Sequence, residues 1–190
     1  GVLTLVGLAD YEVKNSYSIV ITASDGVNSS NQNVSVSVND LNEAPTFTSV
    51  SSYSVQEGIT DIGSITTSDP ENNNITYSIS GTDASSISVN SSTGALTFNT
   101  APDYETKTSY SITASVTDGT NNASEDITIS ILDLDDTAPV FSSSTSFSVA
   151  ELQKSIGTVQ ASDVDSSNIS FSLQDNYVDS GAFIIDSVSG

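Results

Sequence analysis

The 190-residue chain lacks histidine, cysteine, methionine and tryptophan, and it has three basic residues against 24 acidic ones. Without histidine and cysteine it cannot carry a Ser-His or Cys-His catalytic triad, a His- or Cys-ligated zinc or haem, or an iron–sulfur cluster. Without disulfides, its stability must come from buried apolar surface or bound metal. Three lysines also exclude nucleic-acid binding through phosphate contacts and docking on anionic lipid.

Long apolar runs are missing as well, so the sequence predicts no membrane span. There is no signal peptide and no initiating methionine, so we expect a fragment of a larger protein or a processed product. The formal net charge of −21 alone would suit a disordered chain, but 36% of the residues are apolar. The sequence can therefore bury a core.

The sequence repeats itself at an offset of 93 to 94 residues. Asp10-Tyr11-Glu12 matches Asp103-Tyr104-Glu105, and Ala44-Pro45 matches Ala138-Pro139. The two ends of the chain have the same phase within the repeat. The sequence therefore predicts a C-terminal half-repeat at 1–40, a complete repeat at 41–134 and an N-terminal half-repeat at 135–190. We expect neighbouring copies or further sequence to complete the halves, with Gly190 close to Gly1 of another copy.

Within each repeat, apolar and polar residues alternate, as in Tyr110, Ile112, Ala114 and Val116. This period of two indicates strands with one buried face, and turn pairs such as Asp118-Gly119 separate them. No segment has a helical period. About seven short strands in 95 residues predict an all-β antiparallel, Ig-like Greek-key sandwich. The half-repeats should supply its last three and first four strands.

The acidic residues recur at fixed places, mostly near the predicted strand ends. One set of carboxylates surrounds the joint at 133–139: Glu57, Asp103, Glu105, Asp133, Asp135, Asp136, Asp163 and Asp165. These groups would repel one another, and a hard divalent cation would relieve the repulsion. Calcium, which takes six to eight oxygen ligands, fits such a set. Other acids are expected to be solvated surface groups: Asp61, Asp83, Glu125, Asp126, Asp175 and Asp179.

These residues carry a family resemblance over the whole chain. The segment Asp133-Leu134-Asp135-Asp136-Thr137-Ala138-Pro139 resembles the cadherin linker D-x-N-D-N-x-P. Asp103-Tyr104-Glu105 resembles the family's D-R-E, and Asp163-Val164-Asp165 resembles its D-x-D. Glu57 resembles the glutamate that ends the first strand, and Asp118 the late A-x-D ligand. The chain is thus similar to tandem cadherin domains of the kind found in long bacterial surface adhesins.

The resemblance implies Ca²⁺ between successive domains, held at the 133–139 joint by the eight carboxylates named above. At the 40–45 joint it implies these ligands: Asp10, Glu12, Asp40, Asn42, Glu43, Asp69, Glu71 and Asp118. This joint is one residue shorter and has Glu71 for the second Asp of D-x-D, so fewer ions or weaker affinity are expected. Asp25 would be the late ligand of a further joint. Glu151 would meet Asp10 and Glu12 of a neighbouring copy.

The predicted function is a calcium-rigidified structural or adhesive repeat of a long extracellular protein or filament. It would project from a cell surface, or act in adhesion or a biofilm, with neighbouring repeats as partners. The alternative is a carbohydrate-binding or homophilic module, for which exposed Tyr53, Tyr104 and Tyr177 would be the candidates. An enzyme is not expected, because the acids lie at joints between small domains and not in a deep pocket.

Overall fold

The computed structural model describes residues 1–175 and 177–190, which fold into strands and two short 3-10 helices. Contacts divide the chain into two compact units. The first comprises Gly1–Tyr53, Thr60–Thr100 and Tyr110–Ile129, and the second comprises Ser54–Ile59, Ala101–Ser109 and Ser130–Gly190. Within the described residues no helix is long and apolar enough to cross a membrane.

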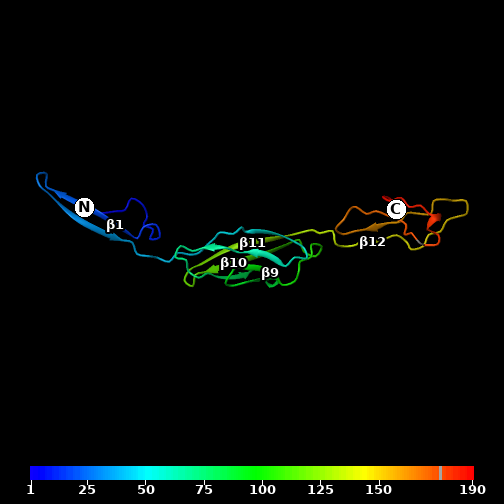
Figure 1. Cartoon of the computed structure of the whole chain (residues 1–190), viewed down its shortest axis with the longest axis horizontal. Helices are drawn as coiled ribbons and strands as arrows, with labels where there is room; N and C mark the ends of the chain where they lie inside the picture. The colour runs from blue at the N-terminus through cyan, green and yellow to red at the C-terminus, as the bar shows by residue number, and fades with distance from the viewer. Residues whose placement is uncertain (176) are drawn as a thin grey trace. The chain divides into compact units, whose positions relative to one another are not determined.

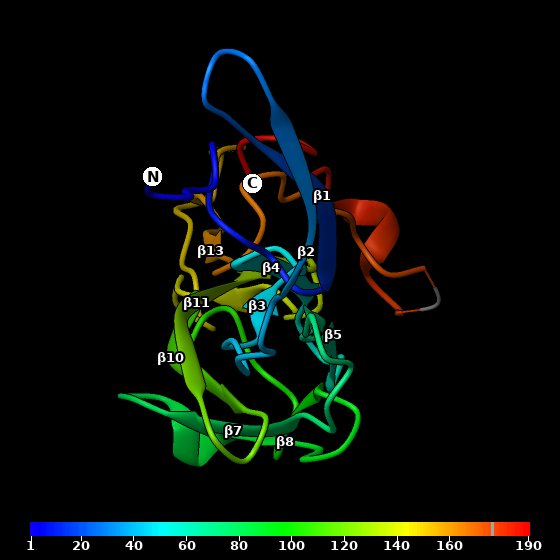
Figure 2. The ribbon, with the colours of Figure 1, turned by 90° about the vertical axis from the view of Figure 1, so that its left-hand side faces the viewer.

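Residues 41–134, which the sequence predicts to be a complete repeat, contain two principal sheets. In the larger sheet the order is β4 (Ser52–Gln56), β11 (Asn122–Leu132), β10 (Ser109–Thr117) and β7 (Thr76–Ser80). In the smaller one it is β5 (Asp61–Ser64), β9 (Ala95–Phe98) and β8 (Ile87–Val89). The helix η1 (Ala84–Ser86) precedes β8, and Figure 2 shows β10 beside β11. The β7–β10, β5–β9 and β8–β9 pairs are antiparallel, as expected. β4 instead runs parallel to β11, since Thr128 donates to the Ser51 carbonyl and Glu57 to the Leu132 carbonyl. The strands confirm the predicted all-β sandwich.

The first two strands of this repeat are each divided into two pieces, β3 and β4 for the first and β5 and β6 for the second. β3 (Thr46–Phe47) pairs with β6 (Thr67–Ser68), whereas β5, the first part of the second strand, pairs with β9. The backbone amides of Thr48 and Ser49 both donate to the carbonyl oxygen of Thr66 between these pieces. Counting each interrupted strand once, the nine assigned spans from β3 to β11 are the seven strands that the sequence predicts.

The alternating residues of β10 and β11 form the core of the complete repeat. Ile112, Ala114 and Val116 on β10 are at most 1% exposed, and Ile127 and Ile129 on β11 are fully buried. The ring of Phe98 meets that of Tyr110 edge-on, with centroids 4.8 Å apart. The period of two in the sequence therefore correctly predicts which faces are buried.

The N-terminal half-repeat forms one hairpin, made of β1 (Ser16–Ser24) and β2 (Ser29–Ser37), which is seen at the blue end of Figure 1. The third strand expected from the match between 1–5 and 94–98 is absent. Leu96, on β9 of the complete repeat, is fully buried, but its counterpart Leu3 is 55% exposed. In the complete repeat β9 pairs with β5 and β8, and a strand without such partners has no backbone acceptors or donors to form a ladder.

The described residues of the C-terminal half-repeat, 135–175 and 177–190, form only β12 (Val140–Phe141), β13 (Ala161–Ser162) and the helix η2 (Ser180–Ala182). The expectation of four strands is therefore only partly met. In the complete repeat β4 pairs with β11 and β7 pairs with β10. The segments that match β4 and β7 lie near 146–150 and 170–174, and they stay irregular because they have no counterpart of β10 and β11 beside them.

The turn that ends this half-repeat is organised by Asp186. Its carboxylate accepts backbone hydrogen bonds from Ser189 at 2.7 Å and Val188 at 3.0 Å, which hold the pKa of Asp186 below its usual range. Asn90 accepts two equivalent bonds, from Ser92 and Thr93, in the complete repeat. The C-terminal half-repeat and the complete repeat thus use the same turn, which has a charged acceptor in the first and a neutral acceptor in the second.

This difference predicts a pH dependence at the C-terminal turn. Because the folded pKa of Asp186 is depressed, its stabilisation is present above the unfolded value of about 3.9 and is lost as the pH falls through the folded value. Hydrogen-exchange protection of the Val188 and Ser189 amides should therefore fall below about pH 4. In Asp186→Asn, which copies Asn90, protection should not change with pH. Equal pH profiles for the two proteins would contradict the prediction.

Candidate metal centres in the linkers

Glu57 is the most buried acidic side chain among the described residues, with 4% of its surface exposed. It directly follows β4, which ends at Gln56, and it precedes Gly58, whose φ is positive. Its Oε2 accepts a hydrogen bond from the Tyr104 amide at 2.9 Å, and its Oε1 accepts one from the Leu134 amide at 2.8 Å. One carboxylate thus joins the loop after β9 to the linker after β11.

Glu57, Glu105 and Asp133 form a first cluster, in which one oxygen of each carboxylate lies within 4.8 Å of the others. Two oxygens on the same Ca²⁺, each at 2.3–2.6 Å, can be at most about 5 Å apart, so this spacing suits a shared cation. Removal from water and the charges of Glu57, Asp165 and Asp135 raise the pKa of Asp133. The cluster therefore concentrates negative charge that is not compensated within it.

Glu105 experiences the same repulsion. Its own backbone N–H lowers the pKa of Glu105, but removal from water and the charges of Glu57, Asp133 and Asp103 outweigh this effect and raise the pKa overall. A bound cation would reverse the balance, since it favours the ionised carboxylate. The electrostatics of the first cluster are therefore compatible with a shared cation.

A second cluster consists of Asp135, Asp163 and Asp165, again with oxygens within 4.8 Å of one another. Asp165 Oδ2 accepts hydrogen bonds from the amides of Asp136 at 3.0 Å and Thr137 at 2.8 Å. A hydrogen bond from the Asp163 carboxyl, together with those two amides, lowers the pKa of Asp165 to about 2. The other oxygen, Oδ1, is buried and has no hydrogen-bond partner.

The third cluster lies in the first unit and comprises Glu12, Asp40 and Glu71, with oxygens within the same 4.8 Å. Neither Glu71 oxygen, although buried, accepts a hydrogen bond from an N–H or hydroxyl group. The Glu71 carboxyl, which can share a proton with Glu43, raises the pKa of Glu43 to about 7, and removal from water and the charges of Glu71 and Glu12 act in the same direction. The shorter linker therefore also gathers unpaired carboxylate oxygens.

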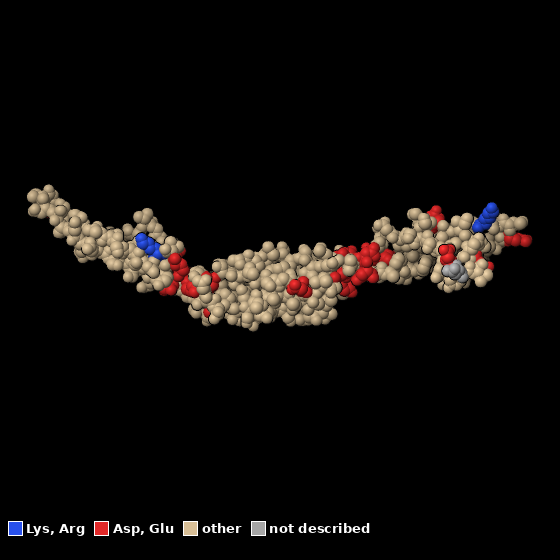
Figure 3. All heavy atoms as spheres, in the orientation of Figure 1, with Lys and Arg blue, Asp and Glu red and all other residues tan. Residues whose placement is uncertain are grey.

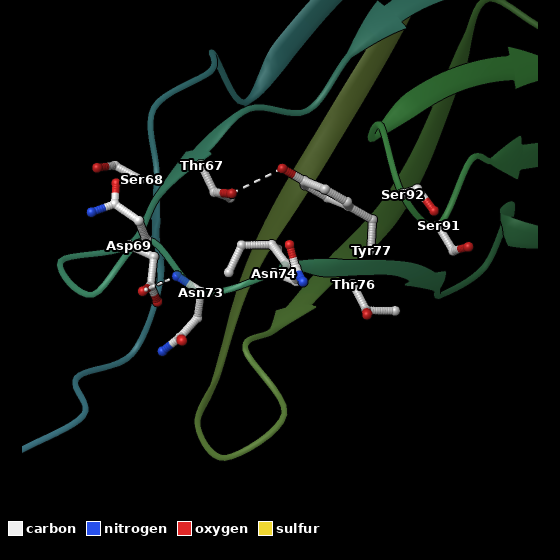
Figure 4. Close-up of a pocket in the computed structure, with 11 residues that line it drawn as sticks. Thr67, Ser68, Asp69, Asn73, Asn74, Thr76, Tyr77, Ser91 and Ser92 are labelled. Carbon is white, nitrogen blue, oxygen red and sulfur yellow. Dashed lines mark hydrogen bonds between the residues drawn. The ribbon is translucent and has the colours of Figure 1, made fainter.

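Asp69 supplies a further buried oxygen next to the same linker. Its Oδ1 accepts a hydrogen bond from the Asn73 amide at 3.0 Å, whereas its Oδ2 is buried without a partner. Asp69 and Asn73 lie at one end of a polar cavity of about 600 Å³ (Figure 4). Farther along this cavity the hydroxyl groups of Tyr77 and Thr67 are hydrogen-bonded to each other. A buried, unpaired carboxylate oxygen costs free energy unless a cation or water reaches it.

Asn42 is held by Asp118, which the sequence analysis grouped with it, and by Asn73 and Asn121, which it did not single out. Its side-chain amide donates to Asp118 Oδ2 at 2.6 Å, and its Oδ1 accepts from Asn73 at 2.6 Å. The Asn121 side chain donates to the Asn42 backbone carbonyl at 2.7 Å. Asp118 and Asn42 therefore lie together through a hydrogen bond, and their role as calcium ligands stays a prediction. Asn121 could have been found, because the Asp118-Gly119-x-Asn121 turn matches Asp25-Gly26-x-Asn28.

The remaining predicted ligands lie outside the three clusters. Asp10 and Asp103 occupy equivalent turns and accept the amides of Val13 and Thr106, respectively. Asp25 accepts the amides of Asn28 and Val27, which lower its pKa. The Asp136 and Glu151 side chains are exposed.

The residues present fit a hard cation such as Ca²⁺, because all the clustered donors are carboxylate oxygens and several are buried without hydrogen-bond donors. Figure 3 shows many of the Asp and Glu side chains gathered into groups. Tyr53 donates its hydroxyl to the Ser64 carbonyl and Tyr104 is half-buried, while Tyr177 is 72% exposed.

Comparison with known proteins defines the protein family. Residues 51–132 match the family model of the cadherin domain. Together with the sandwich fold and the repeated linkers, this match identifies cadherin-type repeats in the chain.

Solved structures agree with this family match. The structure of mouse cadherin-23 EC22-24 aligns with 96% of this chain, over 64% of its own length, with a TM-score of 0.66 and 26% identity. A protocadherin gammaB7 EC3-6 cis-dimer structure covers 97% of this chain and 51% of its own, with a TM-score of 0.71, and at 24% identity it supports the fold alone.

Curated relatives are long animal proteins. The Drosophila melanogaster protocadherin-like wing polarity protein stan is 30% identical over the whole chain, and human protocadherin-23 is 37% identical over 74% of it. The chain spans only 6% and 5% of the lengths of these two relatives. These relatives are animal protocadherins and not the bacterial adhesins expected from the sequence.

Proposed function

We propose that the chain is a calcium-rigidified structural and adhesive segment of a long extracellular cell-surface protein. The observation that carries the proposal is the presence of carboxylate triads at both linkers, with buried oxygens that lack hydrogen-bond donors. The similarity to long protocadherins supports the extracellular and adhesive part. Neither a bacterial origin nor a filament or biofilm role gains support from these relatives, and nothing favours carbohydrate binding or catalysis.

We assign the domains as a half-repeat at 1–40, a complete repeat at 41–134 and a half-repeat at 135–190. Glu57, Glu105 and Asp133 would hold one ion, and Asp135, Asp163 and Asp165 a second. Glu12, Asp40 and Glu71 would hold an ion at the shorter linker. Bound Ca²⁺ supplies positive charge and oxygen coordination. The chain's own part is to bring carboxylates from a linker and from loops on either side of it to one place.

Chelation should lower the melting temperature of the complete repeat and widen the distribution of angles between its neighbours. At a calcium concentration ten times Kd, each ion adds about 1.4 kcal/mol. In a domain of this size this corresponds to a shift of roughly 5–10 °C. Calorimetry and small-angle X-ray scattering, each with calcium and with excess chelator, would measure the two effects. Identical melting curves and scattering profiles would refute the proposal.

The double variant Asp135→Asn/Asp136→Asn should imitate chelation at its linker while the complete repeat stays folded. A matched control is Asp175→Asn/Asp179→Asn, which removes the same two charges at exposed positions of the same half-repeat. The control should keep the full response to calcium. If both double variants lost the response equally, general charge and not a site would explain it.

A further inference from the structure

Asparagine-linked glycans attach at Asn-x-Ser/Thr triplets, and three such triplets lie in the complete repeat, beginning at Asn74, Asn90 and Asn122. A chain rich in asparagine, serine and threonine contains such triplets by chance, so the motif alone assigns no site. An acceptor asparagine of a folded protein lies exposed in a surface loop. The structures around the three asparagines differ in this respect.

Asn90 and Asn122 are parts of regular structure. Asn90 Oδ1 accepts the amides of Ser92 and Thr93, each at 3.0 Å, in the turn between β8 and β9. Asp186 provides the same acceptor in the C-terminal half-repeat, so this turn needs a side-chain oxygen and not an asparagine as such. Asn122 is the first residue of β11. Asn90 therefore has a structural use, and Asn122 lies in a strand.

Asn74 differs from both residues. It is exposed in the loop that precedes β7, and its carboxamide forms no hydrogen bond with any other described residue. The neighbouring Asn73 is engaged, since its side chain donates to Asn42 Oδ1 at 2.6 Å. The triplet that begins at Asn74 ends in the exposed Thr76, whereas the other two end in serine. The Nδ2 of Asn74 is therefore free to carry a sugar.

This triplet lies beside the open edge of the larger sheet. β7 ends the strand order of that sheet and pairs with β10 on one side. The Tyr77 amide donates to the Ser91 carbonyl at 3.0 Å, so Ser91 lies on the side of β7 away from β10. Asn74 and Thr76 line the polar cavity of about 600 Å³ together with Tyr77, Ser91 and Ser92 (Figure 4). A sugar on Asn74 thus has polar groups beside it on the open side of β7.

β7 lacks the features by which exposed edges usually avoid pairing with another chain. Thr76–Ser80 contains no charge and no proline, and its register with β10 has no bulge. Such an edge can serve as a template for a further strand. A bulky, hydrated glycan next to it blocks that approach.

We propose that Asn74 is the acceptor of an N-linked glycan that covers the open edge of β7. The proposal rests on the extracellular part of the proposed function, because this modification is made in the secretory pathway. The donor is an oligosaccharide linked to a lipid diphosphate. A bond forms between Asn74 Nδ2 and the anomeric carbon of the first sugar, and the bond from that carbon to the diphosphate breaks. Nδ2 loses one proton, and the lipid diphosphate is the leaving group.

Secretion of the full chain from cultured animal cells tests the site. Peptide mapping before and after treatment with peptide N-glycosidase, which converts a glycosylated asparagine to aspartate, should show a glycan at Asn74. Asn74→Gln and Thr76→Ala should lose it completely, whereas Thr76→Ser, which keeps the hydroxyl, should retain it. An unmodified Asn74 in the secreted wild type would overturn the proposal. The calcium dependence of melting is measured separately, so this result would leave the calcium function standing.

Hydrogen exchange at the Tyr77 amide tests whether the glycan covers the edge. Exchange should be severalfold slower in the glycosylated chain than in Asn74→Gln, because the sugar restricts access of water to this side of β7. Asn122→Gln is the matched control, since it removes a triplet outside the cavity and should leave the exchange of Tyr77 unchanged. Equal exchange in the glycosylated wild type and in Asn74→Gln would overturn the cover.

Discussion

Replacing Glu57 with alanine is expected to lower the free energy of unfolding of the complete repeat by about 2–6 kcal/mol in calcium. The substitution leaves the amides of Tyr104 and Leu134 without their acceptor, and each unsatisfied buried donor costs about 1–3 kcal/mol. It also removes a carboxylate from the first cluster. Urea unfolding followed by circular dichroism would measure the loss.

Glu57→Gln separates the hydrogen bonds from the charge. The glutamine carbonyl can keep one of the two amide bonds, so in calcium this variant should lose less stability than Glu57→Ala. In chelator its deficit relative to the wild type should shrink, because the wild-type carboxylate then repels Glu105 and Asp133. A deficit of the same size in calcium and in chelator would show that Glu57 has a structural role only.

Leu96→Ala should destabilise the complete repeat by about 2–5 kcal/mol, because Leu96 on β9 is fully buried and its truncation leaves a cavity. Thermal and urea unfolding in calcium would report the change. The expected loss is a large part of the stability of a domain of this size, so a fraction of the protein should unfold at moderate temperature.

Leu3→Ala is the matched control for this prediction. Leu3 occupies the position of Leu96 in the repeat but is 55% exposed, so in dilute protein its truncation should change the stability by less than about 0.5 kcal/mol. An equally large loss in both variants would mean that the N-terminal half-repeat is already covered in the dilute protein. A small loss in both would mean that Leu96 is not in a tight core.

The internal repeat, the strand alternation and the turn chemistry were all available from the sequence. Each depends on residues close together in the chain: the period of two marks the buried faces of β10 and β11, and Asp118-Gly119 gives a turn in which Gly119 has a φ of +97°. The acidic composition and the absence of histidine and cysteine likewise restricted the candidate metal ligands to oxygen donors.

Only the tertiary structure decided how the acids are grouped. The sequence predicted one set of eight ligands at the 133–139 joint, whereas the folded loops separate two triads and leave Asp103 and Asp136 outside them. Glu57 could be placed at a strand end from sequence, but its two backbone donors come from residues 47 and 77 positions away. Such contacts depend on the course of loops, which no local pattern specifies.

The tertiary structure also decided which of the repeated segments become strands. The residues near 1–5 and 170–174 have the same alternation as β9 and β7 yet remain irregular, while β9 and β7 pair with neighbours inside the complete repeat. Alternation records a preference for a half-buried extended chain, but the ladder forms only where a partner supplies donors and acceptors. The sequence by itself therefore determined the strand pattern of the repeat, and the presence of a partner decided where that pattern was realised.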